Sequence, residues 1–296
     1  MDVSIIIVNY NTIDVTRNCI DSVIKQTEGL TYEIILVDNA STDGSKEYFS
    51  NDHRIRYIYS FENLGFGRAN NLGMILSKGE YIFLLNSDTI LLNNAVYEFY
   101  SVVSKDKELN FYGSWLLNRD QSIGLSYGEE PTFTSMFKRL FLPYLHVLKI
   151  KKVNDYDMIF NEERESIKEV GYVSGADMFF SRRIFERYNA FDHNFFMYFE
   201  EAEWQKRVKK LGVKSYILNS PRIVHLQGGS DNAKRKNMSI KSLVMMNKSR
   251  KYFLYKYYGK VPQFLFSVAY FLLKSPEIIV SSEYRLSDKL YFIKNI

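Results

Sequence analysis

The stretch YIFLLNSDT at residues 81–89 is an apolar run that ends at a carboxylate, and it indicates the fold of the chain. Between Tyr81 and Leu85 the only polar side-chain group is one phenol, which is typical of a strand buried on both faces of a parallel sheet. Such a strand places Asp88 at the carboxyl edge of the sheet, where α/β proteins bind their ligands. A carboxylate there can bind a divalent cation, although Asp at a strand end is equally typical of a turn or helix cap.

Similar strands precede this run. Residues 3–10 and 33–37 are apolar and extended in pattern, and residues 14–27 between them carry one apolar stripe at helical spacing. The second strand also stops at a carboxylate, Asp38, and a third is expected at residues 56–60. This alternation predicts an α/β fold with a mostly parallel sheet flanked by helices and joined by right-handed crossovers.

The composition limits the possible classes of protein. With 296 residues, 46% of them hydrophobic, the chain can form one catalytic domain, which we place at residues 1–231. Within it, residues 118–168 are poorly periodic and are expected to form an insertion that covers the ligand site or contacts a second substrate. A single cysteine, Cys19, excludes an intramolecular disulfide and a multi-cysteine zinc site. Neither the dinucleotide-binding glycine fingerprint nor a P-loop is present.

Residues 232–296 are expected to form a basic, aromatic-rich helical extension. Between Asp231 and Glu277 ten lysines and arginines occur without an acid. Such helices suit an anionic membrane surface, or they contact the domain or a second copy in a homodimer. Because no nucleic-acid motif accompanies the charge, no nucleic-acid partner is expected. No run of eighteen uncharged apolar residues occurs, and residues 261–273 come nearest to a membrane span.

Two further places carry candidate chemistry. Glu200 and Glu201 follow an aromatic stretch at a predicted helix start, where apolar surroundings would raise a carboxyl pKa and make a general base. Glu203, in contrast, is explained by an ion pair with Arg207 one turn later. His225 ends a short apolar strand, and it is either a structural residue or a ligand of a metal or diphosphate.

Six motifs in order resemble those of the family 2 glycosyltransferases, most closely the rhamnosyltransferase-like members of bacterial polysaccharide synthesis. They lie at residues 4–11, 37–45, 63–66, 85–89, 196–201 and 224–225. The resemblance implies a GT-A type domain that transfers a sugar, with inversion, from a nucleoside diphosphate to a hydroxyl of a saccharide acceptor.

The resemblance also implies roles for individual residues. Nucleotide-binding positions fall on Asn9, Tyr10, Asp38, Asn63, Arg68 and Ser87. The metal-binding motif places Mg²⁺ or Mn²⁺ on Asp88, with His225 nearby, while Asn86 replaces the first acid of the D-x-D form. The catalytic base maps onto Glu201, with Glu200 as the substitute. The acceptor side maps onto Gly175, Ala176 and Trp204.

The implied substrates are dTDP-rhamnose or a UDP-hexose as donor and a lipid-diphosphate-linked saccharide as acceptor, in capsule or O-antigen synthesis. The implied location is cytoplasmic, at the inner face of the bacterial plasma membrane. Two alternatives remain open at this point. One is a catalytically inactive homologue that binds nucleotide or glycan, and the other is a sugar nucleotidyltransferase, which would release pyrophosphate and have no use for Glu201.

Overall fold

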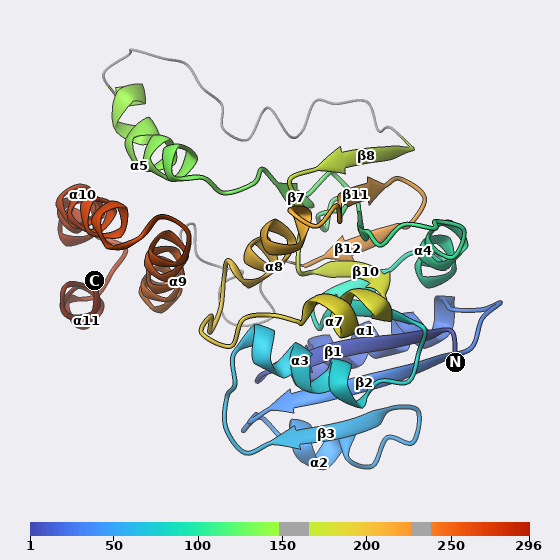
Figure 1. The fold of residues 1–296 in the computed structure, drawn as a ribbon. Coiled ribbons are helices and arrows are strands. Elements are labelled where there is room, and N and C mark those ends of the chain that lie inside the picture. Colours follow the sequence, from blue (N-terminus) through green and yellow to red (C-terminus); the bar gives the residue numbers. More distant parts are fainter. Residues whose placement is uncertain (148–165, 227–237) are drawn as a thin grey trace. The chain divides into compact units, whose positions relative to one another are not determined.

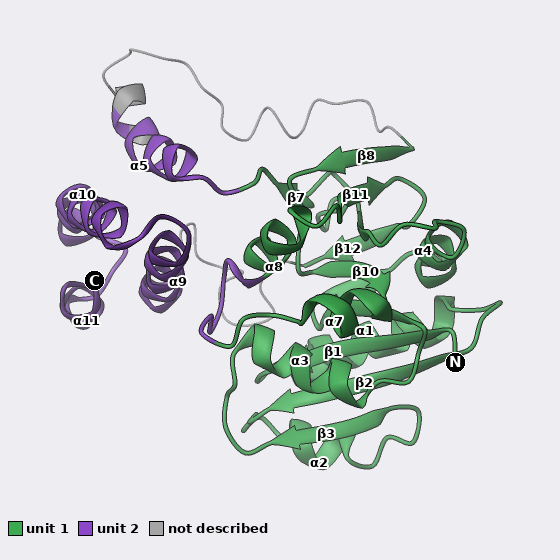
Figure 2. Ribbon diagram, in the orientation of Figure 1, with its two compact units in different colours: residues 1–130, 162–193, 201–233 green, residues 131–161, 194–200, 234–296 purple. Residues whose placement is uncertain are grey.

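The computed structural model describes residues 1–147, 166–226 and 238–296, which divide into two compact units (Figures 1 and 2). The sheet unit contains residues 1–130, 162–193 and 201–233, and the helical unit contains residues 131–161, 194–200 and 234–296. The predicted insertion at 118–168 therefore contributes to both units. Its residues 148–165, and residues 232–237 of the predicted extension, lie outside the described part of the chain.

The sheet unit is built on eight strands in the order β3-β2-β1-β4-β10-β6-β11-β8. Their bounds are β1 Val3–Asn9, β2 Tyr32–Asn39, β3 Arg56–Ser60, β4 Tyr81–Asn86, β6 Phe111–Ser114, β8 Ile167–Val170, β10 Asp177–Ser181 and β11 Ser215–Leu218. Strands β1 to β4 are parallel, and β11 is parallel to β6, whereas β10 runs antiparallel to both β4 and β6. The predicted α/β fold is confirmed, with antiparallel pairs in its second half.

Helices cover both faces of this sheet (Figure 1). They are α1 Ile13–Gln26, α2 Ser45–Phe49, α3 Phe66–Leu76, α4 Ala95–Val103, α7 Arg182–Tyr188 and α8 Glu200–Lys209. Because side chains alternate along a strand, Ile5 and Ile7 pack with α1 in one buried cluster and Ile6 packs with α3 in another. Each such side chain contributes about 1.5–3 kcal/mol on burial. Cys19 of α1 is a core residue.

Two short strand pairs complete the sheet unit. Strand β5, Thr89–Leu91, pairs antiparallel with β12, Ile223–His225, and β7, Tyr127–Gly128, pairs with β9, Tyr172–Val173. In the first pair His225 lies opposite Thr89. Two polar groups that are far apart in the sequence, His225 and Asp88, are brought together by this pairing.

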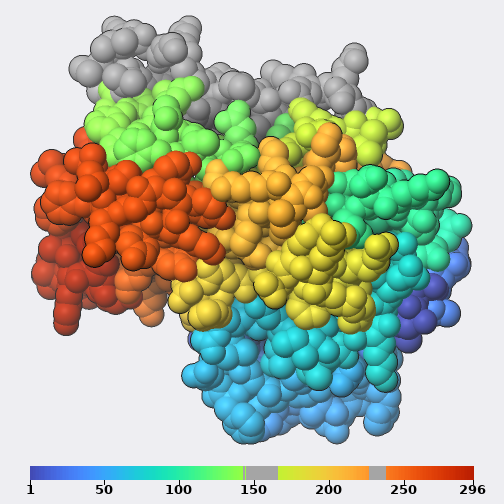
Figure 3. Space-filling model, viewed as in Figure 1, coloured from blue at the N-terminus to red at the C-terminus, as the bar shows by residue number. Residues whose placement is uncertain are grey.

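The helical unit contains α5 Phe133–Val147, α9 Ile240–Tyr258, α10 Lys260–Val280 and α11 Leu286–Asn295, which confirms the predicted helical extension. The C-terminal helices, orange to red in Figure 3, pack as one block around Phe253, Phe266 and Phe292. Helix α10 is long and apolar enough to cross a membrane by length and composition, with 22% of its apolar window buried. Its exposed side chains include Val261, Phe264, Leu265, Val268, Phe271 and Leu272.

Candidate active site

The candidate site lies at the carboxyl edge of the parallel strands. Asn9 at the end of β1 is in register with Asp38 of β2, and Val8 is in register with Asn86 of β4. The loops that follow β1 and β2 each contain a non-glycine residue in the left-handed region, Asn11 at φ 54° and Ala40 at φ 65°. Such conformations cost about 1–3 kcal/mol and are typical of functional sites, so the loops at this edge are held in strained shapes.

Asn9 holds these loops together. Its side chain is fully buried, and its Nδ2 donates to Ser41 Oγ at 3.1 Å. Its Oδ1 accepts hydrogen bonds from the hydroxyls of Thr12 at 2.8 Å and Thr16 at 2.9 Å. Since its polar atoms are already bonded within the protein, Asn9 acts here as a residue that positions the edge loops.

Asp38 is held in the same manner. It is fully buried, its Oδ1 accepts from Ser41 N at 2.9 Å, and its Oδ2 accepts from the Tyr57 hydroxyl at 2.6 Å. Burial and the carboxylate together raise the pKa of Tyr57, so the phenol stays protonated and remains a donor. The carboxylate and its two partners form a rigid polar group directly under the edge.

The next loop is fixed by an asparagine pair. Asn39 Nδ2 donates to Asn63 Oδ1 at 2.9 Å, and Leu64 N donates to Asn39 Oδ1 at 2.8 Å. Asn63 Oδ1 also accepts from Gly65 N at 2.9 Å, and Gly65 adopts φ 79°, a conformation that favours glycine. The predicted nucleotide-binding residue Asn63 therefore shapes the start of α3.

Two predicted nucleotide-binding residues remain accessible. Tyr10 is 48% exposed, and the Arg68 side chain is 45% exposed with one guanidinium nitrogen 3.6 Å from Glu62. An exposed ring suits stacking on a base, and a guanidinium suits a phosphate. Ser87 lies between the loops, with its hydroxyl 3.4 Å from that of Thr12.

Asp88 and His225 form the candidate metal site. The Asp88 Oδ1 lies 3.1 Å from His225 Nε2, and the Asn86 Nδ2 lies 3.4 Å from the same nitrogen. Leu226 N donates to the Asp88 carbonyl at 2.8 Å, which fixes the β12 end beside the turn. Both side chains are about one-sixth exposed, at 16% for Asp88 and 17% for His225.

The described residues contain no cluster of three or more His, Cys, Asp or Glu that could hold a metal by themselves. One carboxylate and one imidazole fit a Mg²⁺ or Mn²⁺ ion whose other ligands are water and the oxygens of a substrate diphosphate. The turn that carries Asp88 is held in place by Thr89, whose Oγ1 donates to the Asn86 carbonyl at 2.7 Å. The same oxygen lies 3.4 Å from the Sγ of the buried Cys19.

The predicted base, Glu201, lies in the first turn of α8. Tyr198 and Phe199, just before the helix, adopt φ 70° and 71°, two consecutive left-handed residues that lack glycine's freedom. Burial raises the pKa of Glu201, while hydrogen bonds from its own backbone N–H and that of Ala202 oppose the rise. A carboxyl with a raised pKa at a strained turn suits a general base. Glu200, the substitute base, is 3% exposed.

The predicted acceptor residues connect the base to the metal turn. A Cβ on Gly175 would lie 3.1 Å from the Phe66 ring and 3.8 Å from Glu201 Cβ, so this backbone lies directly against both side chains. The next residue, Ala176, accepts a hydrogen bond from Asn86 N at 2.9 Å. These consecutive residues therefore contact the helix of the candidate base on one side and the turn of the candidate metal ligand on the other.

Trp204 lies elsewhere, which corrects the sequence-based assignment to the acceptor side. It is fully buried, and its ring lies 4.8–5.2 Å from those of Phe111, Phe180 and Phe191, centroid to centroid. It points from α8 into the core because it stands on the face of the helix that packs on β6 and β10 of the sheet. Glu203 is buried too and pairs with Arg207 at 3.2 Å, as predicted.

Asp177 is a buried acid at this edge that the sequence reading missed. Its Oδ2 accepts from Ser114 N at 2.7 Å and Ser114 Oγ at 2.5 Å, whereas its Oδ1 is buried without a partner among the described residues. Burial raises the pKa of Asp177 to about 7, although the two hydrogen bonds from Ser114 and, to a smaller extent, the interaction with His225 oppose this rise. The available signal was a single acid, Asp177, within the apolar run at 176–180.

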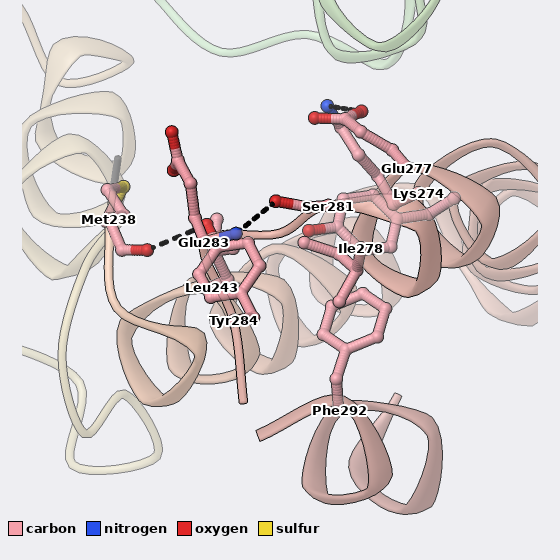
Figure 4. A pocket seen from close by; sticks show the side chains of 10 residues that line it. Met238, Leu243, Lys274, Glu277, Ile278, Ser281, Glu283, Tyr284 and Phe292 are labelled. Carbon is pink, nitrogen blue, oxygen red and sulfur yellow. Dashed lines mark hydrogen bonds and ion pairs between the residues drawn. The ribbon is translucent and has the colours of Figure 1, made fainter. Parts of the chain in front are cut away.

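The helical unit contains a separate pocket with a volume of about 360 Å³ (Figure 4). Apolar side chains of Leu243, Ile278 and Phe292 line its interior. Around it lie Glu283 and the ion pair of Lys274 with Glu277 at 2.7 Å. None of the residues predicted from the sequence as site residues lines this pocket.

The sequence matches the family model described as Glycosyl transferase family 2 over residues 4–188, more than half of the chain, and the chain belongs to this family. The matched region contains β1 from Ser4 onward, β2 to β4, the loops at their carboxyl edge, and all of β10 and α7. Together with the strand order, the match supports the GT-A type architecture implied by the motifs.

Several relatives carry glycosyltransferase names. Glycosyltransferase GlyG of Streptococcus pneumoniae is 35% identical over 133 residues, which are 42% of this chain and 42% of GlyG. The low-salt glycan biosynthesis hexosyltransferase Agl10 of Haloferax volcanii is 28% identical over 214 residues, 71% of this chain and 62% of Agl10. A poly(ribitol-phosphate) beta-glucosyltransferase of Bacillus spizizenii is 33% identical over 112 residues, 34% of this chain and 17% of that protein. The chain thus spans less than two thirds of each of these relatives.

Proposed function

We propose that this protein is a metal-dependent inverting glycosyltransferase, which moves a sugar from a nucleoside diphosphate to a hydroxyl of a saccharide acceptor. The observation that carries the proposal is the pair Gly175 and Ala176. These residues place the candidate base Glu201 and the turn before Asp88 on either side of one short backbone segment. A base and a leaving-group site on opposite sides of the reacting sugar are what a single displacement requires.

Each group then has a defined role in the transfer. Glu201 accepts the proton of the acceptor hydroxyl as its oxygen bonds to the anomeric carbon, and the bond from that carbon to the diphosphate breaks on the opposite face. Asp88 and His225 would hold Mg²⁺ or Mn²⁺, which supplies positive charge for the departing diphosphate. Arg68 adds a cation at the same edge, and Tyr10 offers a ring to the base of the nucleotide.

The proposed substrates are those that the motif resemblance implies, and the relatives' names support a role in glycan synthesis. A donor such as dTDP-rhamnose or a UDP-hexose, and a lipid-diphosphate-linked saccharide as acceptor, place the protein in synthesis of a bacterial surface polysaccharide such as capsule or O-antigen. Agl10 and the poly(ribitol-phosphate) enzyme are themselves named for glycan or polymer glycosylation. The exposed apolar side chains of α10, next to the basic residues of α9, support peripheral binding at the inner face of the membrane.

A donor-hydrolysis screen tests the proposal. The protein is incubated with dTDP-rhamnose, UDP-galactose, UDP-glucose or UDP-N-acetylglucosamine in Mg²⁺, Mn²⁺ or EDTA, and the released nucleoside diphosphate is measured. We expect release from one donor, loss in EDTA, and a loss of about 10²–10⁴-fold in Glu201→Gln, the usual scale for a general base. Glu186→Gln, which removes an exposed carboxylate of α7, is the matched control and is expected to retain activity.

Calorimetry on the same samples separates the alternatives. Release of pyrophosphate when a nucleoside triphosphate and a sugar 1-phosphate are supplied in place of the nucleotide sugar would indicate a nucleotidyltransferase. Donor binding without turnover, even when a saccharide acceptor is supplied, would indicate an inactive binding homologue. Absence of binding to any nucleotide sugar would refute the proposed function.

A further inference from the structure

Arg250 of α9 occupies an unusual environment within the helical unit. Its guanidinium carbon lies 5.7 Å from the centre of the Phe199 ring, 5.6 Å from that of Phe266 and 5.8 Å from that of Tyr270. Aromatic faces attract a cation, so these rings account for the position of the side chain. Ring faces are not acceptors for the paired in-plane bonds that the guanidinium N–H groups make with an anion, so those donors need other partners.

The in-plane donors of Arg250 are poorly satisfied. One terminal nitrogen lies 3.3 Å from the Met246 sulfur, a weak acceptor, and no carboxylate in the described part of the chain pairs with Arg250. The side chain is partly buried, and burial lowers the pKa of Arg250. A buried cation without a counter-ion is unfavourable, so an arginine in this position calls for an anion.

A second arginine lies on α5, a helix that packs against both α9 and α10. Arg139 is exposed on α5, and its positive charge contributes to the lowered pKa of Arg250. No carboxylate pairs with Arg139 either within the described residues. The two helices that carry these arginines pack on one another, because the Phe133 ring of α5 lies 6.1 Å from the Tyr258 ring of α9. Phe137 of α5 also packs edge to face on Phe266 of α10 at 5.4 Å. The fold therefore holds two like charges near one another, which repel unless a bound anion offsets them.

We propose that Arg250 and Arg139 form a binding site for a phosphate or diphosphate group within the helical unit. Guanidinium groups bind phosphate oxygens with paired, charge-assisted hydrogen bonds, and an anion in the plane of Arg250 would use the donors that the aromatic rings leave free. The pocket of Figure 4 does not suit an anion, because the carboxylates of Glu277 and Glu283 lie at it. That the ligand is the diphosphate of a lipid-linked acceptor rests on the proposed function.

The first test is calorimetric titration of the full-length protein with inorganic pyrophosphate in EDTA, which removes metal from the donor site. Arg250→Met and Arg139→Gln are compared with Lys241→Gln, which removes the same charge from an exposed position of α9. We expect each arginine substitution to weaken binding roughly 10- to 100-fold, the scale of hydrogen bonds to charged groups, and the lysine substitution less than about twofold. Equal losses in all three variants, or no binding by the wild type, would overturn the proposal.

Arg250→Lys guards against misfolding as the cause, because it retains the charge and loses the paired donors. It should also bind more weakly than the wild type while unfolding at a similar temperature. An affinity equal to the wild type would show that charge alone is sufficient and would refute the arginine geometry.

The source of the phosphate group is tested with phosphatidylcholine vesicles that contain or lack farnesyl diphosphate. Arg250-dependent flotation with the diphosphate-bearing vesicles supports a lipid ligand. Arg250-dependent binding of free pyrophosphate alone supports a soluble phosphate compound at the same site. The affinity of the wild-type protein for nucleotide sugar in Mg²⁺, measured in parallel, reports on the proposed function separately. Failure of one proposal can thus be recognised without failure of the other.

Discussion

Replacement of Asp177 by asparagine should remove a pH dependence of stability that this one side chain creates. Burial raises its pKa from 3.8 to about 7, so between these values the folded protein keeps a proton that the unfolded chain has lost. Stability therefore falls as pH rises through this window, by about 1.4 kcal/mol per pH unit and about 4 kcal/mol in all. The substituted amide would resemble the protonated acid, accept the same two Ser114 hydrogen bonds and bring no charge into the core.

Thermal unfolding measured from pH 4 to pH 8 checks this expectation. At pH 8 the Asp177→Asn variant should unfold roughly 10 °C above the wild type, since 1 kcal/mol corresponds to about 2–4 °C in a domain of this size. At pH 4 the wild-type side chain is protonated in the folded state, and this advantage should vanish. Glu186→Gln, at an exposed position, should leave the wild-type slope unchanged. A variant that is less stable than the wild type at pH 8, or that shows the same pH slope, would refute the inference that burial raises the pKa of Asp177.

Two other substitutions test the edge of the sheet. Tyr57→Phe removes the hydroxyl that donates to Asp38 Oδ2 and leaves a buried carboxylate oxygen unpaired. We therefore expect the free energy of unfolding to fall by about 1–3 kcal/mol and nucleotide binding to weaken. Urea unfolding with and without nucleotide sugar measures both effects, and an unchanged unfolding midpoint would contradict the expectation. Gly175→Ala places a methyl group 3.1 Å from the Phe66 ring, beside Glu201. The turnover number should fall about tenfold or more while the affinity for the nucleotide sugar changes little, because a small displacement of the general base slows proton transfer. Steady-state kinetics measures the turnover number and calorimetry measures the affinity. A loss confined to affinity would contradict this expectation.

The first half of the sheet could be predicted from the sequence because its signals are local. The run that ends at Asp88 is apolar without interruption, and the strand that ends at Asp38 repeats the pattern. Parallel pairing then places both carboxylates at one edge, and the structure has them there. The same argument, that the ends of parallel strands share one edge of the sheet, predicts the position of the candidate site residues that follow these strands.

Other features depend on contacts between distant parts of the chain. Residues 131–147 belong to the same helical unit as α9 and α10, which lie about 100 residues later in the chain. No composition shift near residue 131 predicts that the chain enters another unit there. Trp204 follows soon after the aromatic stretch at 195–199 and would suit either a core or a sugar-binding face, and only its ring partners assign it to the core. Asn9 was identified from its place in a sequence motif. Its hydrogen bonds to Ser41 and Thr16 could not be predicted, because they depend on contacts between segments that are distant in the sequence.

The direction of β10 explains why the edge is a single site and not a row of separate loops. Because β10 runs antiparallel to β4, its first residues, and not its last, lie at the carboxyl edge of the parallel strands. Three consecutive residues there reach four different elements: Gly175 lies against α3 and α8, Ala176 bonds β4, and Asp177 bonds Ser114 of β6. A shift at any of them displaces the candidate base and the metal turn together. For this reason we expect substitutions at residues 175–177 to alter turnover and stability jointly, whereas substitutions of Tyr10 or Arg68, which extend from the edge, should alter donor affinity alone.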